Sequence, residues 1–212
     1  MINGSRHYSI DNSRLPSVTS ILSATKSEED KAGITAWKER VGHKEAERIK
    51  NEAANRGSSM HSYIEQFLLG KFNLDLLDED NKSKKMAVEI IDNGLKNKLS
   101  EIWGTEATVY YPGKYAGTAD CIGIYEGKET ILDFKQSNKP KKQEFILDYL
   151  LQGSGYSLAH NTVYNSRITQ VAILICTVDG LFQDFKIEGN ELINFQNQFL
   201  EKVEQFYHQL RK

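Results

Sequence analysis

The chain has 212 residues and contains little of several residue types, and each shortage excludes a class of protein. Its two cysteines are too few for a disulfide framework, a four-cysteine zinc site or an iron–sulfur cluster. Both of them, Cys121 and Cys176, stand in apolar stretches, so we expect two buried free thiols. Three prolines and the lack of any Gly/Ser linker favour one domain over residues 1–212.

The sequence also lacks long apolar runs and an excess of charge. No apolar run approaches the roughly 18 residues that a membrane-spanning helix needs. Residues 1–15 have neither the apolar centre nor the basic flank of a signal peptide, and they make a poor transit peptide, so we expect a protein of a bacterial or phage-infected cytoplasm. The 27 Lys and Arg residues face 29 Asp and Glu residues, which excludes a polybasic protein but not an enzyme of nucleic acids.

The spacing of apolar residues is helical in residues 1–100 and changes to strand-like after Gly104. It predicts helices over 15–22, 28–41, 46–67, 82–99, 141–161 and 191–210, and an acidic loop over 75–80. It predicts strands over 106–111, 118–125, 130–134, 168–176 and 181–187. This order predicts an α/β fold with a mixed central β-sheet flanked by helices. The parts are a mainly helical N-terminal part (1–100), a sheet core (104–190) and a closing helix (191–212).

Two acidic residues and a lysine stand in the predicted strands. Asp133 and Lys135 share one face of their strand, because alternate side chains point the same way. If Glu126-Gly127 forms a two-residue hairpin loop, Asp120 lies opposite Asp133, with Cβ atoms ~4.5–5.5 Å apart. Two such carboxylates favour a cation between them, with Mg²⁺ as the natural ion and Mn²⁺ as a substitute. The alternative is a surface hairpin whose charges are solvated.

Polar side chains at helical spacing accompany this motif. His61 and Glu65 are four residues apart and share one face of the long helix, and Gln152 and Tyr156 do the same on the helix after the strands. Each pair has a structural alternative. A histidine beside an apolar face is more often structural than a ligand, and Gln152 and Tyr156 could be ordinary helix and core residues.

Together these segments resemble the PD-(D/E)xK nuclease superfamily, in its RecB-like exonuclease branch, with the mitochondrial genome maintenance and small phage exonucleases as the nearest likeness. The likeness extends over roughly residues 15 to 187 and has four matching segments, at 56–61, 117–120, 133–135 and 152–156. It implies a restriction-endonuclease-like core that holds Mg²⁺, or Mn²⁺ as a substitute. The implied metal ligands are His61, Asp120, Asp133 and the main-chain carbonyl of Phe134.

The same resemblance implies catalytic roles for Asp120, Asp133 and Lys135. It makes Glu106 a further acidic candidate, and Glu65 and Trp37 are added as candidate site residues. It also implies DNA as the partner, with substrate-binding roles for Gln152 and Tyr156. Local positive charge adds Arg56, just ahead of the His61 motif, and Lys139, Lys141 and Lys142 as candidate substrate-binding residues. The run from Lys135 to Lys142 holds four lysines and no acid, a pattern that favours contacts with phosphates. The alternative is a solvated loop.

We therefore expect a Mg²⁺-dependent deoxyribonuclease, an exonuclease that degrades single-stranded DNA ends or flaps. The sequence points to no membrane, no iron–sulfur cluster and no protein partner. Two alternatives stay open, a structure-specific endonuclease on the same core and a catalytically inactive DNA-binding module. The intact set of two acids and a lysine argues against the inactive module, which would not need it.

Overall fold

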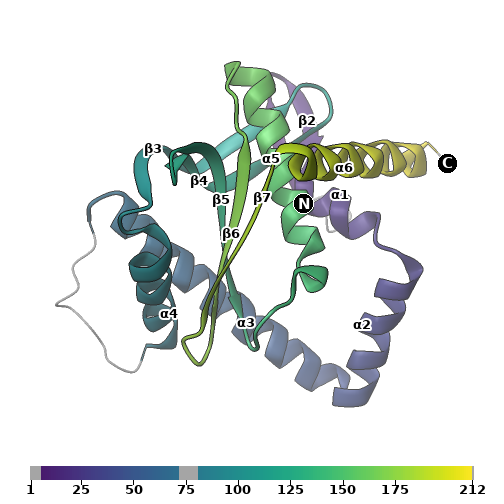
Figure 1. Ribbon diagram of the computed structural model, residues 1–212. Helices are drawn as coiled ribbons and strands as arrows, with labels where there is room; N and C mark the ends of the chain where they lie inside the picture. Colours follow the sequence, from purple (N-terminus) through teal and green to yellow (C-terminus); the bar gives the residue numbers. More distant parts are fainter. Residues whose placement is uncertain (1–5, 72–80, 212) are drawn as a thin grey trace.

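The computed structural model describes residues 6–71 and 81–211, and a five-stranded sheet stands at its centre. The strands lie in the order β3-β4-β5-β6-β7, and only the β5–β6 pair is parallel, so the sheet is mixed (Figure 1). Their bounds are β3 Leu99–Tyr111, β4 Tyr115–Tyr125, β5 Lys128–Ser137, β6 Gln170–Thr177 and β7 Phe182–Glu188. The predicted fold class is confirmed.

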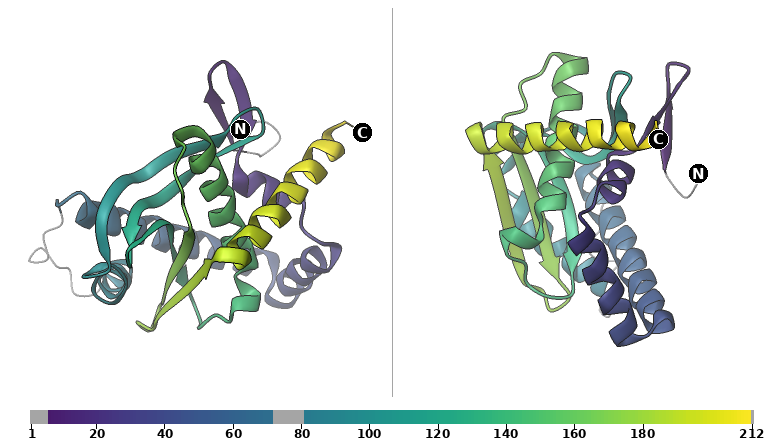
Figure 2. Two further views of the ribbon diagram at one scale, coloured as in Figure 1. Left: turned by 45° about the horizontal axis from the view of Figure 1, so that its top comes forward. Right: turned by 90° about the vertical axis from the view of Figure 1, so that its right-hand side faces the viewer.

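Helices cover both faces of this sheet (Figure 2). The helices α1, α5 and α6 pack on one face and α3 and α4 on the other, while α2 packs beside α3. Their bounds are α1 Val18–Ala24, α2 Glu28–Val41, α3 His43–Leu68, α4 Lys82–Ile90, α5 Leu147–Tyr164 and α6 Gly189–Leu210. A π-helical segment, Ile91–Leu95, follows α4, and a 3₁₀ turn, Gln143–Phe145, precedes α5.

The core has two halves because alternate residues of the strands point to opposite faces of the sheet. On β5, Ile131 packs with the α5 and α6 side, whereas Leu132 and Phe134 pack with the α3 and α4 side. All eight residues of β6 are buried, as expected for a strand covered on both faces. Cys121 and Cys176 are both buried and free, as predicted.

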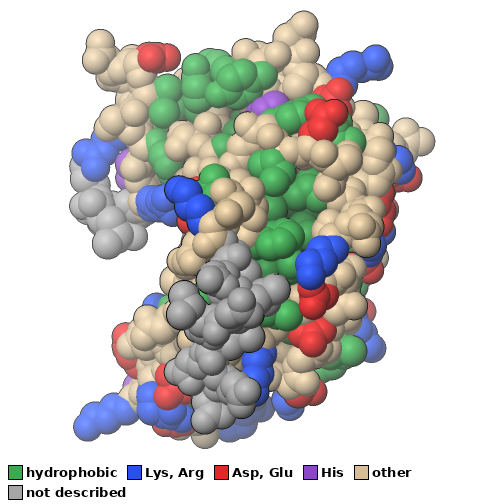
Figure 3. Space-filling model, turned by 90° about the vertical axis from the view of Figure 1, so that its left-hand side faces the viewer, with side chains coloured by type: hydrophobic (Ala, Val, Ile, Leu, Met, Phe, Trp, Pro, Cys, Tyr) green, Lys and Arg blue, Asp and Glu red, His purple; other side chains and the backbone are tan. Residues whose placement is uncertain are grey.

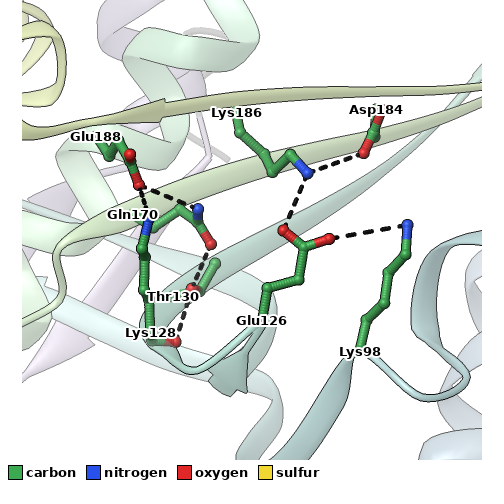
Figure 4. A network of polar contacts seen from close by, with 8 residues as sticks. All are labelled: Lys98, Glu126, Lys128, Thr130, Gln170, Asp184, Lys186 and Glu188. Carbon is green, nitrogen blue, oxygen red and sulfur yellow. Dashed lines mark hydrogen bonds and ion pairs between the residues drawn. The ribbon is translucent and has the colours of Figure 1, made fainter.

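The predicted two-residue loop between β4 and β5 is confirmed. Tyr125 pairs with Lys128, and the ladder continues to the pair of Cys121 with Leu132. Glu126 and Gly127 have φ of 49° and 77°, the left-handed values that a type I′ hairpin turn requires. Glu126 also accepts a hydrogen bond from Lys186 at 3.0 Å, which connects the turn to β7, the strand at one edge of the sheet (Figure 4).

Several predicted boundaries are wrong. The helix predicted over 82–99 ends with the π-helical segment at Leu95, and Leu99 already begins β3. The helix predicted from Lys141 begins at Leu147, because a side chain of β7 holds the main chain of Lys141 outside any helix. The Gln183 amide accepts a hydrogen bond from Lys141 N at 2.8 Å and donates one to Lys141 O at 2.9 Å.

A short hairpin near the N-terminus was not predicted. It pairs β1 His7–Ile10 with β2 Ser13–Pro16, and its turn residues Asp11 and Asn12 have φ of 44° and 62°. The helix predicted from Leu15 therefore begins later, at Val18, with Ser17 as its N-cap.

Some expectations are left untested by the fold. The predicted acidic loop over 75–80 lies outside the described residues. The single domain over residues 1–212 stays a prediction. Among the helices described, none has both the length and the apolar character for crossing a lipid bilayer.

Candidate active site

The β4–β5 hairpin brings two carboxylates to the end of its ladder. Beyond the pair of Cys121 with Leu132, Asp120 Oδ2 accepts a hydrogen bond from the main-chain N–H of Phe134 at 2.7 Å. This carboxylate thus replaces a main-chain acceptor at the point where the regular pairing stops. The side chain of Asp120 is 11% exposed and that of Asp133 is 1% exposed. Both acidic side chains are therefore largely removed from water.

Burial makes this pair of acids costly in its ionised form. Burial first, and then repulsion from Asp133, raise the pKa of Asp120 to about 6, although His61 and Lys135 oppose the shift. Two neighbouring buried carboxylates are stable as anions only when positive charge lies beside them. The site is therefore suited to a cation.

Lys135 supplies one positive charge directly. Its ammonium forms an ion pair with Asp133 Oδ2 and lies 5.2 Å from the centroid of the Tyr149 ring. Burial lowers the pKa of Lys135, but the carboxylates of Asp133 and Asp120 outweigh burial and raise the pKa above its ordinary value. Lys135 therefore keeps its charge at neutral pH, and 20% of its side chain is exposed.

Three residues from three elements form a group that can hold a metal ion. One ligand atom each of His61 (α3), Glu106 (β3) and Asp120 (β4) lies within 4.8 Å of the others. His61 Nδ1 is 3.5 Å from Asp120 Oδ1 and 3.9 Å from Glu106 Oε1. The two carboxylates supply the oxygen ligands that Mg²⁺ and Mn²⁺ prefer, and His61 adds one imidazole, a ligand of divalent transition metals. The chemistry of the residues present therefore fits a divalent metal.

The backbone at Glu106 supports a role for that residue. Its φ is 45°, in the left-handed region that a glutamate rarely adopts. Such strained residues persist where the surrounding structure enforces them, and they gather at functional sites. The structure therefore joins Glu106, a further acidic candidate of the sequence analysis, to His61 and Asp120. Glu65, one turn after His61 on α3, is not part of the three-residue group.

Gln152 and Tyr156 reach the site through Asp133. The Gln152 amide donates hydrogen bonds to Asp133 Oδ1 at 3.0 Å and to the Tyr156 hydroxyl at 3.1 Å. Tyr156 is buried, with 3% of its surface exposed. The i, i+4 spacing therefore serves to hold an acid in place. A direct contact of either residue with substrate stays a prediction, as does the metal-binding role of the Phe134 carbonyl.

The structure explains why a glycine stands three residues before Asp120. A Cβ atom on Gly117 would lie 2.3 Å from Cε1 of the buried Tyr156 ring. Gly117→Ala should therefore destabilise the protein by about 1–3 kcal/mol, because the ring must shift away from its packed position. The midpoint of thermal unfolding measures this loss.

Gly33→Ala is the matched control for that variant. No atom lies within 4 Å of a Cβ at Gly33, which is in the exposed helix α2, so alanine there should be neutral or stabilising. Equal melting temperatures for Gly117→Ala and the wild type would contradict the tight packing of Tyr156.

Arg56 connects α3 to the end of β5. Its guanidinium donates hydrogen bonds to Gln136 Oε1 at 2.9 Å and to Asn138 Oδ1. Gln136 in turn donates to Ala53 O of α3 at 3.2 Å. The sequence analysis missed Gln136, although a polar residue directly after Lys135, inside a mostly buried strand, is a usable signal. Contact of Arg56 with phosphate stays a prediction.

Part of the lysine run lies beside Lys135. Lys139 and Lys141 line a pocket of about 370 Å³ together with Tyr149, whose ring Lys135 contacts. Lys142 is exposed, with its ammonium 3.8 Å from Glu144. A strand bound at the acidic residues therefore has positive charge next to it. Trp37, the remaining candidate, lies on α2, none of whose residues is buried, and its contact with DNA stays a prediction.

The lysine run gives a salt-dependence prediction. Changing Lys139, Lys141 and Lys142 together to glutamine should weaken the binding of every single-stranded sequence about equally. Each lost phosphate contact flattens the plot of log K against log[salt] by about 0.7, so three contacts give about two units. Binding titrations at several salt concentrations measure this slope.

The matched control changes three lysines at the other end of the sheet, Lys98, Lys128 and Lys186, which form ion pairs with acidic side chains (Figure 4). This variant carries the same change of net charge and should keep the wild-type slope. Equal slopes in the wild type and the Lys139, Lys141 and Lys142 variant would show that the run is only a solvated loop.

Comparison with known proteins supports the resemblance found in the sequence. The chain is 28% identical over 174 residues to mitochondrial genome maintenance exonuclease 1 of Homo sapiens, which covers 78% of the chain and 50% of that protein. It is 26% identical over 207 residues to the protein of the same name from Xenopus tropicalis, covering 92% of the chain and 58% of that protein. The chain thus spans about half the length of the curated relatives it matches.

A crystal structure of a protein from Eubacterium rectale is also similar, with a TM-score of 0.47 and 17% identity, over 71% of this chain and 64% of that one. No family model matches the chain. The two relatives named as exonucleases fit a nuclease of the PD-(D/E)xK type, as the motifs predicted.

Proposed function

We propose that this chain is a metal-dependent deoxyribonuclease that hydrolyses phosphodiester bonds from the free ends of single-stranded DNA or flaps. The observation that carries the proposal is the meeting of two buried carboxylates, Asp120 and Asp133, with a charged lysine, Lys135, next to His61 and Glu106. Buried acids and bases with shifted pKa values gather at catalytic sites. The names of the sequence relatives support a nuclease reaction.

His61, Asp120, Asp133 and the carbonyl of Phe134 would hold Mg²⁺, with Mn²⁺ as a substitute and Glu106 as a further ligand. When bound, the metal would stabilise the charge that develops on the scissile phosphate and lower the pKa of the attacking water. The protein keeps these ligands oriented in advance. The Phe134 N–H orients Asp120, and the Gln152 amide and the Lys135 ammonium hold the two oxygens of Asp133.

Lys135 would position the attacking water or stabilise the negative charge of the phosphate in the transition state. Its ammonium is held between Asp133 and the Tyr149 ring, so the positive charge has a defined position before the substrate binds. The adjoining pocket with Lys139 and Lys141 would bind phosphates of the same strand, and Arg56 would contribute beside Asn138. DNA with an unpaired, free end is the substrate that we propose.

A degradation assay on end-labelled DNA tests this function. Linear single strands, circles of the same sequence and flapped duplexes are each incubated with and without Mg²⁺. We expect metal-dependent release of nucleotides from the linear strand and the flap, and an intact circle. Cleavage of the circle would instead identify an endonuclease, and DNA binding without any cleavage would identify an inactive binding module.

A further inference from the structure

An aromatic pocket outside the candidate active site is open to solvent. It has a volume of about 410 Å³ and lies between the edge strand β3 and the C-terminal end of α5. Its walls include Trp103, Ala107, Val109, Ile122, His160 and Tyr164. Figure 3 views the molecule from the side of β3, where exposed hydrophobic side chains gather. An apolar pocket open to water points to a ligand.

The aromatic rings of this pocket present flat faces. The rings of Trp103 and His160 are nearly parallel, at 17°, with centroids 6.3 Å apart. The Tyr164 ring is tilted against His160, with centroids 4.7 Å apart. Trp103 is 43% exposed and Tyr164 is 61% exposed, so both rings are accessible to solvent. Burial lowers the pKa of His160, which leaves a neutral imidazole between them at neutral pH.

A local distortion of β3 positions Trp103. The register of β3 with β4 shifts between Ile102 and Gly104, so Trp103 is the extra residue of a β-bulge, a feature that redirects a side chain. A second shift lies between Leu99 and Glu101. Gly123 of β4 pairs with the next residue, Ile102, and a Cβ on Gly123 would lie 1.9 Å from Glu101 O. The glycine thus accommodates the bulged backbone. The orientation of Trp103 is therefore built into the edge strand.

The pocket adjoins the candidate active site along two elements. On α5, His160 lies eight residues after Gln152, which contacts Asp133, a separation of about 12 Å along the helix. On β3, Trp103 lies three residues before Glu106, about 10 Å away. Both distances fall within the span of a bound single strand of several nucleotides.

We propose that this pocket binds an unpaired nucleobase of the DNA strand whose scissile phosphate lies at Asp120 and Asp133. The inference rests on the proposed nuclease function and adds a base-stacking subsite to it. Aromatic rings stack on every base regardless of sequence. The charged group bonded to Trp103 is the carboxylate of Glu101, at 3.1 Å from the indole nitrogen, and a carboxylate repels a phosphate but not an uncharged base. The pocket therefore suits the base and leaves the phosphates outside.

Binding of a labelled oligothymidylate in EDTA tests the subsite without cleavage. Trp103→Ala should weaken binding about tenfold, the effect of losing one base stack, and Trp103→Phe should restore most of the affinity. Ile102→Ala is the matched control, because Ile102 is equally exposed, at 43%, but does not line the pocket. Equal affinities of Trp103→Ala and the wild type would overturn the proposal.

A second measurement locates the stacked base. Strands that carry a single abasic site, moved one position at a time from each end, are bound to the wild type and to Trp103→Ala. The wild type should lose affinity at one position near an end, and the variant should show no loss there. If both proteins respond alike at every position, the subsite does not exist.

The two proposals fail in different ways. A wild type that binds and degrades single strands, but is unaffected by Trp103→Ala, overturns the subsite alone. A wild type that neither binds nor degrades them overturns the nuclease function and the subsite together.

Discussion

Replacing Lys135 with alanine should lower the rate of single-strand hydrolysis by about 10²–10³-fold, the usual effect of removing one group that stabilises transition-state charge. The same change leaves Asp133 buried without its ion-pair partner, which typically destabilises a metal-free protein by about 3–5 kcal/mol. Bound Mg²⁺ should recover part of that loss, because it replaces the missing positive charge. Single-turnover rates and thermal unfolding with and without Mg²⁺ measure the two effects.

Lys135→Arg separates stability from catalysis. The guanidinium keeps the charge next to Asp133 and should preserve much of the stability, but its planar shape differs from that of the ammonium, so the rate should still fall. If Lys135→Ala, folded and saturated with DNA, retains more than about a tenth of the wild-type turnover, Lys135 is not a catalytic residue.

Asp120→Asn should abolish metal binding and yet stabilise the metal-free protein. The pKa of Asp120 is raised from 3.8 to about 6, so between these values the folded state binds a proton that the unfolded chain has released. Stability therefore falls as the pH rises through this window, and the penalty is complete above it. Removing the charge should raise the free energy of unfolding at pH 7 by up to about 3 kcal/mol, and by nothing below pH 4.

Metal ions should stabilise the wild type but not Asp120→Asn. Mn²⁺ or Mg²⁺ should raise the melting temperature of the wild type, since a ligand that binds only the folded state stabilises it, and should leave Asp120→Asn unchanged. Asp148→Asn is the matched control. It removes the same charge from a side chain that is 48% exposed and lies outside the site. A metal-induced shift of wild-type size in Asp120→Asn would refute the role of Asp120 as a ligand.

Local patterns predicted the parts of the site that lie on neighbouring segments. The Glu126-Gly127 turn fixes the register of β4 and β5, which brings Asp120 and Asp133 to the same end of the ladder. The helix over 28–41 has the predicted bounds, because Ser27 caps its start and Gly42 follows its end. Where the sequence contains the residues typical of a turn or a helix cap, the resulting local structure could be predicted.

Other parts depend on packing between distant segments and could not be derived. Glu106 meets His61 only because α3 packs against the sheet. From the sequence alone, Glu65, four residues after His61, was an equally good candidate for a partner of His61. The two bulges in β3 interrupt the alternation of side chains, so residues 99–105 did not have the pattern of a strand. The turn at Asp11-Asn12 contains no glycine, which hid the N-terminal hairpin.

The most direct test of the account compares the wild type with Asp133→Asn in their release of labelled nucleotides from linear single-stranded DNA. Both proteins are assayed over a series of Mg²⁺ concentrations, after confirming that they are folded and bind the strand. We predict a wild-type rate that rises with Mg²⁺ to saturation, and no release by Asp133→Asn at any concentration. Release that does not depend on Mg²⁺, or equal release by the two proteins, would contradict a metal-dependent nuclease centred on the acids of the β4–β5 hairpin.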